Sequence, residues 1–231
     1  MAELWENNNK QWFDRNRQRY EEFVRQPLKA LAQALAGPVS TIIPEFSGDP
    51  KISRINNDIR FSPHKPLYKE HMWISFGGSG ESCGADIFAA VDRHGWCTGC
   101  GIASPKREPL DNWRKNLLEF APLWRQYMKV RRFGDEILAH FENKYKKPLY
   151  PDIPDDLCDL VQAKGVWLVE KPRLIFKKAP EKEFFAGICR NLPIFLFMSQ
   201  SPKILPQRLA QLGRIIPAPD DEVAQIWSVF R

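Results

Sequence analysis

The residue types best suited to chemistry gather in one stretch of the chain, RINNDIRFSPHKPLYK, which runs from Arg54 to Lys69. This stretch combines several cations with one carboxylate, Asp58, and one tyrosine, Tyr68. Guanidinium groups bind carboxylates and phosphates through paired hydrogen bonds, and an adjacent lysine and tyrosine can complete such a pocket. The sequence therefore predicts an anion-binding site formed by these side chains: Arg54, Asp58, Arg60, Lys65, Tyr68 and Lys69.

The order of the residues indicates how a strand would position them. Apolar and polar residues alternate over 52–61, which is typical of a strand and would place Arg54, Asp58 and Arg60 on one face. Asp58 would then stay ionised between the two arginines and hold them in register. The alternative is structural, because the same charges could form an ion-pair network that ties the strand to an N-terminal helix. The residues leave both interpretations open.

A catalytic version of this site would need a group that carries a proton. Tyr68, His64 and Asp58 are the candidates, with Lys65 close to them in the sequence. Each could serve as an acid or a base if the fold brings it to a substrate. These residue types indicate no specific reaction, and we expect no cofactor. The sequence therefore leaves both an enzyme and a non-catalytic binding protein open.

A second stretch, HGWCTGC at 94–100, invites redox or metal chemistry. A reactive dithiol needs its first cysteine at a helix N-terminus, but the residues after Cys100 do not start a helix. In a strand, Cys97 and Cys100 would point to opposite faces. A zinc site made of Cys83, His94, Cys97 and Cys100 would lack a second well-spaced pair of ligands. We therefore expect ordinary buried cysteines and no metal site.

The composition is typical of a soluble globular protein. Of the 231 residues, 43% are hydrophobic and 27% charged, and the formal net charge of +6 favours anionic partners such as nucleic acid or phosphorylated metabolites. The polar N-terminus shows no targeting segment, and the longest apolar run, 192–198, is too short to cross a bilayer. The five cysteines do not suggest a disulfide framework. We expect a cytoplasmic location and no membrane contact.

Hydrophobic periodicity divides the chain into helices at both ends and strands in the middle. Residues 9–25 and 27–36 are expected to be helical, with Gly37 ending the second helix. The turn sequence Asp92–Gly95 predicts a hairpin between two strands. Together these features predict an α+β fold with a mainly antiparallel sheet and flanking N-terminal and C-terminal helices. We expect one domain over 1–231, with N-terminal helices over 9–36, a sheet core over about 52–103, and mixed helices and short strands over 109–231.

Basic residues close to aromatic ones support an alternative function. Lys129–Arg132 precedes Phe133, and Lys144–Lys147 follows Phe141 and includes Tyr145. Cations interleaved with stacking rings can bind single-stranded nucleic acid, although the same residues also suit a helix end or a solvated loop. The alternative to an anion-binding protein is therefore a non-catalytic module that binds nucleic acid or another protein.

Two groups of residues together resemble a known family. The first is NNKQWFD at 8–14 followed by Arg19-Tyr20, and the second is the pattern Arg54, Asp58-Ile59-Arg60-Phe61, Lys65 and Tyr68. With them the chain is similar to the bacterial and fungal family called domain of unknown function 2461. The family pattern is Arg-x-x-Arg-Asp-x-Arg-Phe, then Asp or Asn followed by Lys-x-x-Tyr. Asn57 stands where this pattern has its second arginine, and His64 stands where it has Asp or Asn.

The resemblance covers most of the chain and implies a common fold and a common polar cluster. It implies no reaction, because none is assigned to the family. The cation that Asn57 replaces and the residue that His64 replaces would both belong to that cluster. Taken together, the residues and the resemblance predict a small phosphorylated or carboxylated ligand.

Overall fold

The computed structural model describes residues 1–43, 46, 49–60, 64–77, 84–103, 107–176 and 179–230. Within this part of the chain, six strands form one sheet in the order β1-β2-β3-β4-β6-β5, and all neighbouring strands are antiparallel. Helices precede and follow the strands in the sequence, which confirms the predicted α+β class. The strands are β1 (Lys51–Ile52), β2 (Met72–Gly77), β3 (Ala85–Asp92), β4 (Gly95–Ile102), β5 (Ile137–Phe141) and β6 (Val166–Glu170).

The helices form three groups along the chain. The first group is α1 (Ala2–Glu6), α2 (Lys10–Tyr20), the π-helical turn η1 (Glu21–Arg25) and α3 (Gln26–Ile42). The second is α4 (Arg107–Glu119), α5 (Ala121–Val130), the 3-10 turn η2 (Asp155–Leu157) and α6 (Cys158–Gln162). The third is α7 (Pro180–Ser199), α8 (Leu205–Ile215) and α9 (Asp221–Ser228). None of the helices described here combines the length and the apolar character that crossing a bilayer requires.

The first helices form one helical run from Lys10 to Ile42. Asn9 caps its start, because its side-chain oxygen accepts a hydrogen bond from the Trp12 backbone N–H (2.9 Å). The predicted end at Gly37 is wrong, since α3 continues to Ile42.

The continuation beyond Gly37 has a physical cause in the core. Val39 and Ile42 are 0% and 3% exposed, so the last turn of α3 buries two branched side chains. The Ser40 and Thr41 hydroxyls also donate to the Gly37 carbonyl (2.8 and 3.1 Å). Apolar burial of this size outweighs the low helix propensity of one glycine.

Helix α7 is the central helix of the molecule and packs on β3, β4, α3 and α4. Pro193 lies inside it and has no N–H, so the Cys189 carbonyl loses its helical donor. The Trp227 indole N–H donates to this carbonyl (3.0 Å), and the Tyr127 hydroxyl donates to the carbonyl of Arg190 (2.8 Å). Side chains of α9 and α5 thus satisfy the backbone of α7 near the proline.

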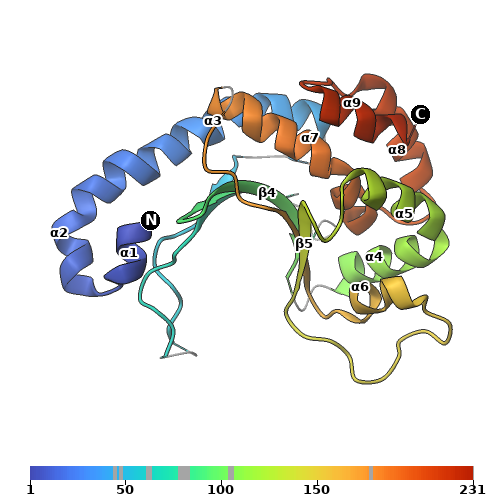
Figure 1. Cartoon of the computed structure of the whole chain (residues 1–231), viewed down its shortest axis with the longest axis horizontal. Helices are drawn as coiled ribbons and strands as arrows, with labels where there is room; N and C mark the ends of the chain where they lie inside the picture. The colour runs from blue at the N-terminus through green and yellow to red at the C-terminus, as the bar shows by residue number, and fades with distance from the viewer. Residues whose placement is uncertain are drawn as a thin grey trace.

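The molecule has the shape of an arch (Figure 1). The sheet curves beneath α3 and α7, with α1 and α2 at one end and α4, α5 and α6 at the other. No described helix or strand lies over the sheet face turned away from α7. Residues 53–60 and 64–69, and the loop after β5, project on this side, which we call the open face.

Candidate functional site

The predicted cluster lies on an extension that continues beyond β1 and β2, at one end of the open face (Figure 1). The Asn57 backbone N–H donates to the Leu67 carbonyl (2.9 Å), and the Lys69 N–H donates to the Ile55 carbonyl (2.7 Å). The two halves of 53–69 therefore run side by side and hold each other.

The expected strand over 52–61 is wrong. Strand β1 ends at Ile52, and the residues that follow add a single bridge to the sheet pattern. Residues 56–60 are mostly exposed, so they have no apolar face whose burial would fix a strand. Arg54, Asp58 and Arg60 consequently do not form a row on one strand face, and Phe61 lies outside the described residues.

Asp58 and Arg60 pair with each other at the far end of the extension. Arg60 Nε and Nη2 donate to the two Asp58 carboxylate oxygens (3.0 and 2.6 Å), and the side chains of Asp58 and Arg60 are 55% and 77% exposed. The hydrogen bond from Arg60 lowers the pKa of Asp58. An exposed pair of this kind contributes little stability. His64 and Lys65 are exposed on the same extension.

Tyr68 connects the extension to the N-terminal helices. It is 5% exposed, and its ring stacks on Phe13 of α2 with centroids 4.1 Å apart. The Asn8 side chain accepts a hydrogen bond from the Tyr68 N–H and donates one to the Tyr68 carbonyl, both at 2.9 Å. This placement agrees with the structural alternative for Tyr68, in which the cluster ties the extension to the first helices.

Arg54 and Lys69 form the part of the cluster that lacks a counter-charge. The Lys69 ammonium group donates to the Arg54 carbonyl (2.8 Å) and lies 4.6 Å from the centre of the Trp73 ring. Partial burial and the nearby Arg54 charge lower the pKa of Lys69. Within the described ranges, neither cation forms an ion pair with a carboxylate.

Cross-strand pairing identifies the residues on the open face. Paired residues of antiparallel strands point to the same face. One set contains Ile74, Ala89 and Cys100, which are each at most 1% exposed. This set faces α7, where the Cys100 thiol contacts the Asn191 carbonyl (3.3 Å). The other set forms three rows across the open face: Lys51, Ser75, Phe88, Gly99, Val169 and Leu138; Gly77, Asp86, Gly101, Trp167 and His140; Trp73, Ala90 and Cys97.

Small residues occupy the middle of the open face, and aromatic rings rest on them. A Cβ atom at Gly101 would overlap the Trp167 ring, and one at Gly99 would press against Phe88. The Phe88 and Trp167 rings meet edge to face with centroids 5.8 Å apart. The two glycines thus allow the rings to lie on the backbone of β4 and form an apolar surface.

Polar groups border this apolar surface on the side of β2. The Ser75 hydroxyl donates to Asp86 Oδ1 (2.9 Å), and a Cβ atom at Gly77 would overlap the same oxygen. His71 stacks on Trp73 with centroids 5.3 Å apart, and partial burial lowers its pKa. A histidine with a lowered pKa is a neutral hydrogen-bonding group near pH 7.

The two cysteines of the HGWCTGC stretch point to opposite faces, as predicted from their strand. Burial raises the pKa of the Cys97 thiol to about 12 and that of Cys100 well above its usual value, so neither is a ready nucleophile. The described residues hold no group of three His, Cys, Asp or Glu side chains suited to a metal ion. Cys83, which the zinc alternative requires, lies outside them.

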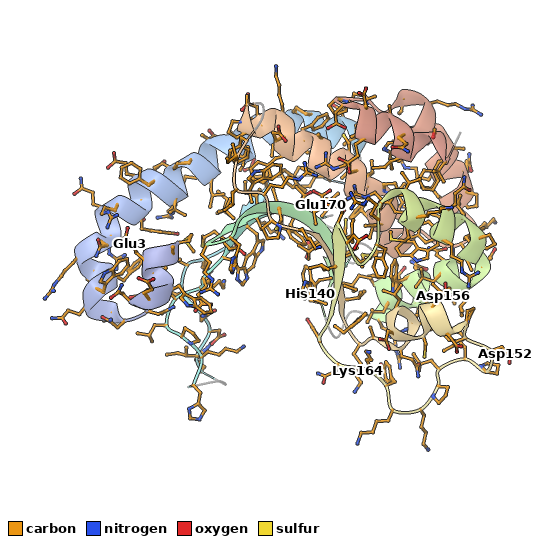
Figure 2. The ribbon with its side chains drawn as sticks, viewed as in Figure 1. Glu3, His140, Asp152, Asp156, Lys164 and Glu170 are labelled. Carbon is orange, nitrogen blue, oxygen red and sulfur yellow. The ribbon has the colours of Figure 1, made fainter. Side chains whose placement is uncertain are left out.

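The far edge of the open face is formed by β5 and the loop that follows it. His140 is exposed and pairs across the sheet with Trp167. Figure 2 shows His140 on β5 at the rim of the arch and Lys164 lower on the same side. The Lys164 ammonium group lies 5.0 Å from the centre of the Tyr145 ring.

These features define an antiparallel α+β protein with one sheet face covered by helices and one open. A family model described as "Conserved hypothetical protein (DUF2461)" matches residues 1–181. The chain belongs to this family, which confirms the resemblance found in its sequence. Most of α7 and all of α8 and α9 follow the matched region. No curated protein and no protein of solved structure matches the chain.

The structure divides the predicted site residues into three parts and adds others. Asp58, Arg60 and Lys65 lie at the exposed end of the extension, Tyr68 lies in the core, and Arg54 and Lys69 lie beside the sheet. Sequence reasoning missed Trp73, Ser75, Asp86 and Trp167, although two signals could have found them. The first signal is that every second residue from 69 to 75 is polar or aromatic: Lys69, His71, Trp73 and Ser75. The second is a pair of glycines in one strand, Gly99 and Gly101, which leave room for rings on the same face.

Proposed function

We propose that the open face of the sheet binds a small anionic ligand that also carries a ring or another apolar part. Arg54 and Lys69 hold the anionic group in this proposal. The observation that supports it is their missing counter-charge, since repulsion from Arg54 helps to lower the pKa of Lys69. A bound phosphate or carboxylate would relieve this repulsion and accept hydrogen bonds from both side chains.

The apolar part of the ligand would rest on the surface made by Phe88, Trp167 and the glycines beneath them. Both rings are already in place through their contact with each other and with β4. Covering apolar area contributes roughly 25 cal/mol per Å² before the cost of association is counted. The Ser75–Asp86 pair at the border would form hydrogen bonds with a polar substituent of the ligand.

The remaining residues of the predicted cluster have indirect roles in this proposal. Arg60 and Lys65 attract the anion through long-range electrostatics, with Asp58 holding the Arg60 side chain. Tyr68 positions the extension by packing on Phe13. Asn57 donates to the Pro66 carbonyl (2.8 Å) and so helps to hold the two halves of the extension together.

Calorimetric titration with phenyl phosphate tests the proposal, with inorganic phosphate and phenol as the two halves of the probe. Lys69→Met should weaken phenyl phosphate binding about 10- to 100-fold, because a charge-assisted hydrogen bond contributes ~1.5–3 kcal/mol. Lys65→Met is the matched control, since Lys65 is an exposed lysine on the same extension. It should change affinity little.

Two results would overturn the proposal. One is equal loss of affinity in Lys65→Met and Lys69→Met, which would mean that only general charge matters. The other is the absence of any heat of binding for phenyl phosphate up to about 10 mM, a concentration that would detect even a weak site.

A nucleic-acid-binding function is the second candidate, and the loop after β5 favours it. Tyr145 is 41% exposed, with the Lys164 ammonium group beside its ring, and Lys146 and Lys147 are exposed next to it. Gln162 holds the loop by donating to the Lys147 carbonyl (3.2 Å) and accepting from the Leu149 N–H (3.1 Å). Rings flanked by cations can stack on unpaired bases.

Binding of a fluorescent oligothymidylate at rising salt tests this second candidate. The candidate requires retention at low salt, a steep decline as salt rises, and a smaller slope after Lys146→Gln with Lys147→Gln. No retention at the lowest salt would reject it. Retention that Tyr145→Ala leaves unchanged would exclude stacking on this loop.

A further inference from the structure

A pocket opens on the helix-covered side of the sheet, away from the open face. Its volume is about 570 Å³, and it lies between the end of α5, the segment after β6 and the starts of α7 and α9. This volume falls within the range of roughly 300–1,000 Å³ that is usual for small-molecule sites. Its charged lining consists of three arginines and three glutamates: Arg131, Arg132, Arg173, Glu136, Glu183 and Glu222.

Glu183 is the lining residue without a partner. It lies in the first turn of α7, lines the pocket and is only 9% exposed. No described residue forms a hydrogen bond or an ion pair with its carboxylate. A cation or hydrogen-bond donors would stabilise a carboxylate at such a largely buried position. The pocket therefore offers an open position for a positively charged group.

Arg173 is a cation of the lining whose guanidinium N–H donors are only partly used. Its side chain is 38% exposed, and its ion pair with Glu222 is loose, at 3.8 Å. The guanidinium group also lies over the Trp96 ring, 5.7 Å from its centre. Because a guanidinium carries five N–H donors, Arg173 can still bind a carboxylate of a ligand.

The back wall of the pocket is a network of buried charges that pair with one another, although Arg131 Nε has no hydrogen-bond partner among the described residues. Arg131 donates to Glu222 (2.9 Å) and to Glu170 (2.6 Å), and Arg190 donates to Glu170 (3.0 Å). Arg131, Arg190 and Glu170 are at most 4% exposed. The network fixes the wall and occupies Glu170 and Glu222, which leaves Glu183 as the acceptor for a new cation.

We infer that this pocket binds a small zwitterion, an amino acid or a short peptide with free ends. The ammonium group pairs with Glu183, and the carboxylate pairs with Arg173. A ligand with both charges matches a lining in which arginines and glutamates balance, whereas a simple anion or cation would leave one side uncompensated. Val130 and Ile175 provide apolar contact for its remaining atoms.

A calorimetric series of alanine, dialanine and trialanine tests the inference, because the distance between the two charges grows along the series. One member should bind best, and capping either end of that member, by N-acetylation or C-terminal amidation, should weaken binding at least tenfold. Glu183→Gln should cause a similar loss. Glu181→Gln is the matched control, since Glu181 is an exposed glutamate in the same helical turn.

The inference is overturned if capped and free peptides bind alike, if none of the three binds up to about 10 mM, or if Glu181→Gln loses as much as Glu183→Gln. Arg173→Gln provides a second variant if Glu183→Gln does not fold, and it should lower the affinity for the free peptide but not for its amide. Lys69→Met should leave peptide binding unchanged, so this site and the open face can fail independently.

Discussion

Lys69 is the residue on which the proposed anion site depends most. Its ammonium group is packed over the Trp73 ring, bonded to a backbone carbonyl, and placed beside Arg54 rather than beside an acid. Such a lysine loses its proton more easily than an exposed one, and an anion bound next to it would restore the charged form. The affinity for an anionic ligand should therefore change with pH as Lys69 loses its proton.

The pH dependence of phenyl phosphate binding follows from this lowered pKa. Affinity should fall as Lys69 deprotonates, and the fall should begin at a lower pH than the ordinary lysine value of 10.5 would give. Lys69→Arg should bind without this fall, because arginine stays protonated over the same range. Calorimetry at a series of pH values measures both proteins, and an identical pH profile for them would argue against contact between Lys69 and the anion.

Glu170 contributes to stability rather than to the open face. Figure 2 shows it between the sheet and the helices. Burial alone would raise the pKa of its carboxyl, but the Arg190 and Arg131 guanidiniums outweigh burial and lower that pKa to about 2. Because the folded pKa lies below the ordinary value of 4.5, the ionised carboxylate stabilises the fold. That contribution is complete above about pH 4.5 and is lost as the pH falls toward 2.

Glu170→Gln should accordingly lower the free energy of unfolding at pH 7 by about 3–5 kcal/mol, because it leaves two buried arginines without their shared carboxylate. The difference from the unaltered protein should shrink as the pH is lowered below 4.5. Urea unfolding at several pH values measures this. Glu3→Gln is the control, since Glu3 pairs with Arg19 at 2.8 Å on the surface, and its replacement should leave the midpoint nearly unchanged. A pH-independent loss in Glu170→Gln would contradict this account.

At the scale of elements, α7 shows how a proline is accommodated inside a buried helix. Pro193 frees the Cys189 carbonyl, and the Trp227 indole of α9 takes the place of the missing donor. The proline therefore couples two helices that are separated in the sequence.

Trp227→Phe should cost ~1–3 kcal/mol of stability beyond the lost packing, because it leaves a buried carbonyl without a donor. The same change in a Pro193→Ala background should cost less, since alanine supplies the helical N–H. A double-mutant cycle by urea denaturation gives the coupling between the two positions. Additive effects would show that the indole bond does not depend on the proline.

Local signals in the sequence predicted much of the fold. The predicted turn at Asp92–Gly95 joins β3 and β4, with Gly95 at a φ of +128° that favours glycine. The extension was predicted poorly, because residues 58–60 alternate like a strand but belong to none of the strands described. The Glu170 network was not predictable, since its arginines lie 39 and 20 residues away along the chain.

The candidate site stays a prediction, and the structure changes how its residues are grouped. The cluster of cations marked the extension, yet the pattern could not distinguish Asp58 and Arg60, which satisfy each other, from Arg54 and Lys69, which do not. That distinction depends on where side chains meet in space. The prediction that follows is that the open face, rather than the exposed end of the extension, binds the ligand.

At the scale of the whole molecule, the arch gives the two faces of the sheet different surroundings. One face is sealed against α7 and carries the core, while the other presents glycines, rings and a cation pair between two projecting segments (Figure 1). Phe88 is 8% exposed and Trp167 is half-buried, so the rings form a small apolar surface. An apolar surface bordered by polar groups often marks a binding site. The architecture thus supports the open face as the place where this protein meets its ligand.

The most direct test of this central claim is an NMR titration with phenyl phosphate that follows the indole N–H signals. We predict that the signals of Trp73 and Trp167 shift together and saturate. Those of Trp113 and Trp227, which are buried and bonded to the Leu160 and Cys189 carbonyls, should stay in place. Shifts confined to the backbone amides of residues 58–60 and 64–65, with Trp73 and Trp167 unchanged, would contradict the account and move the ligand to the end of the extension.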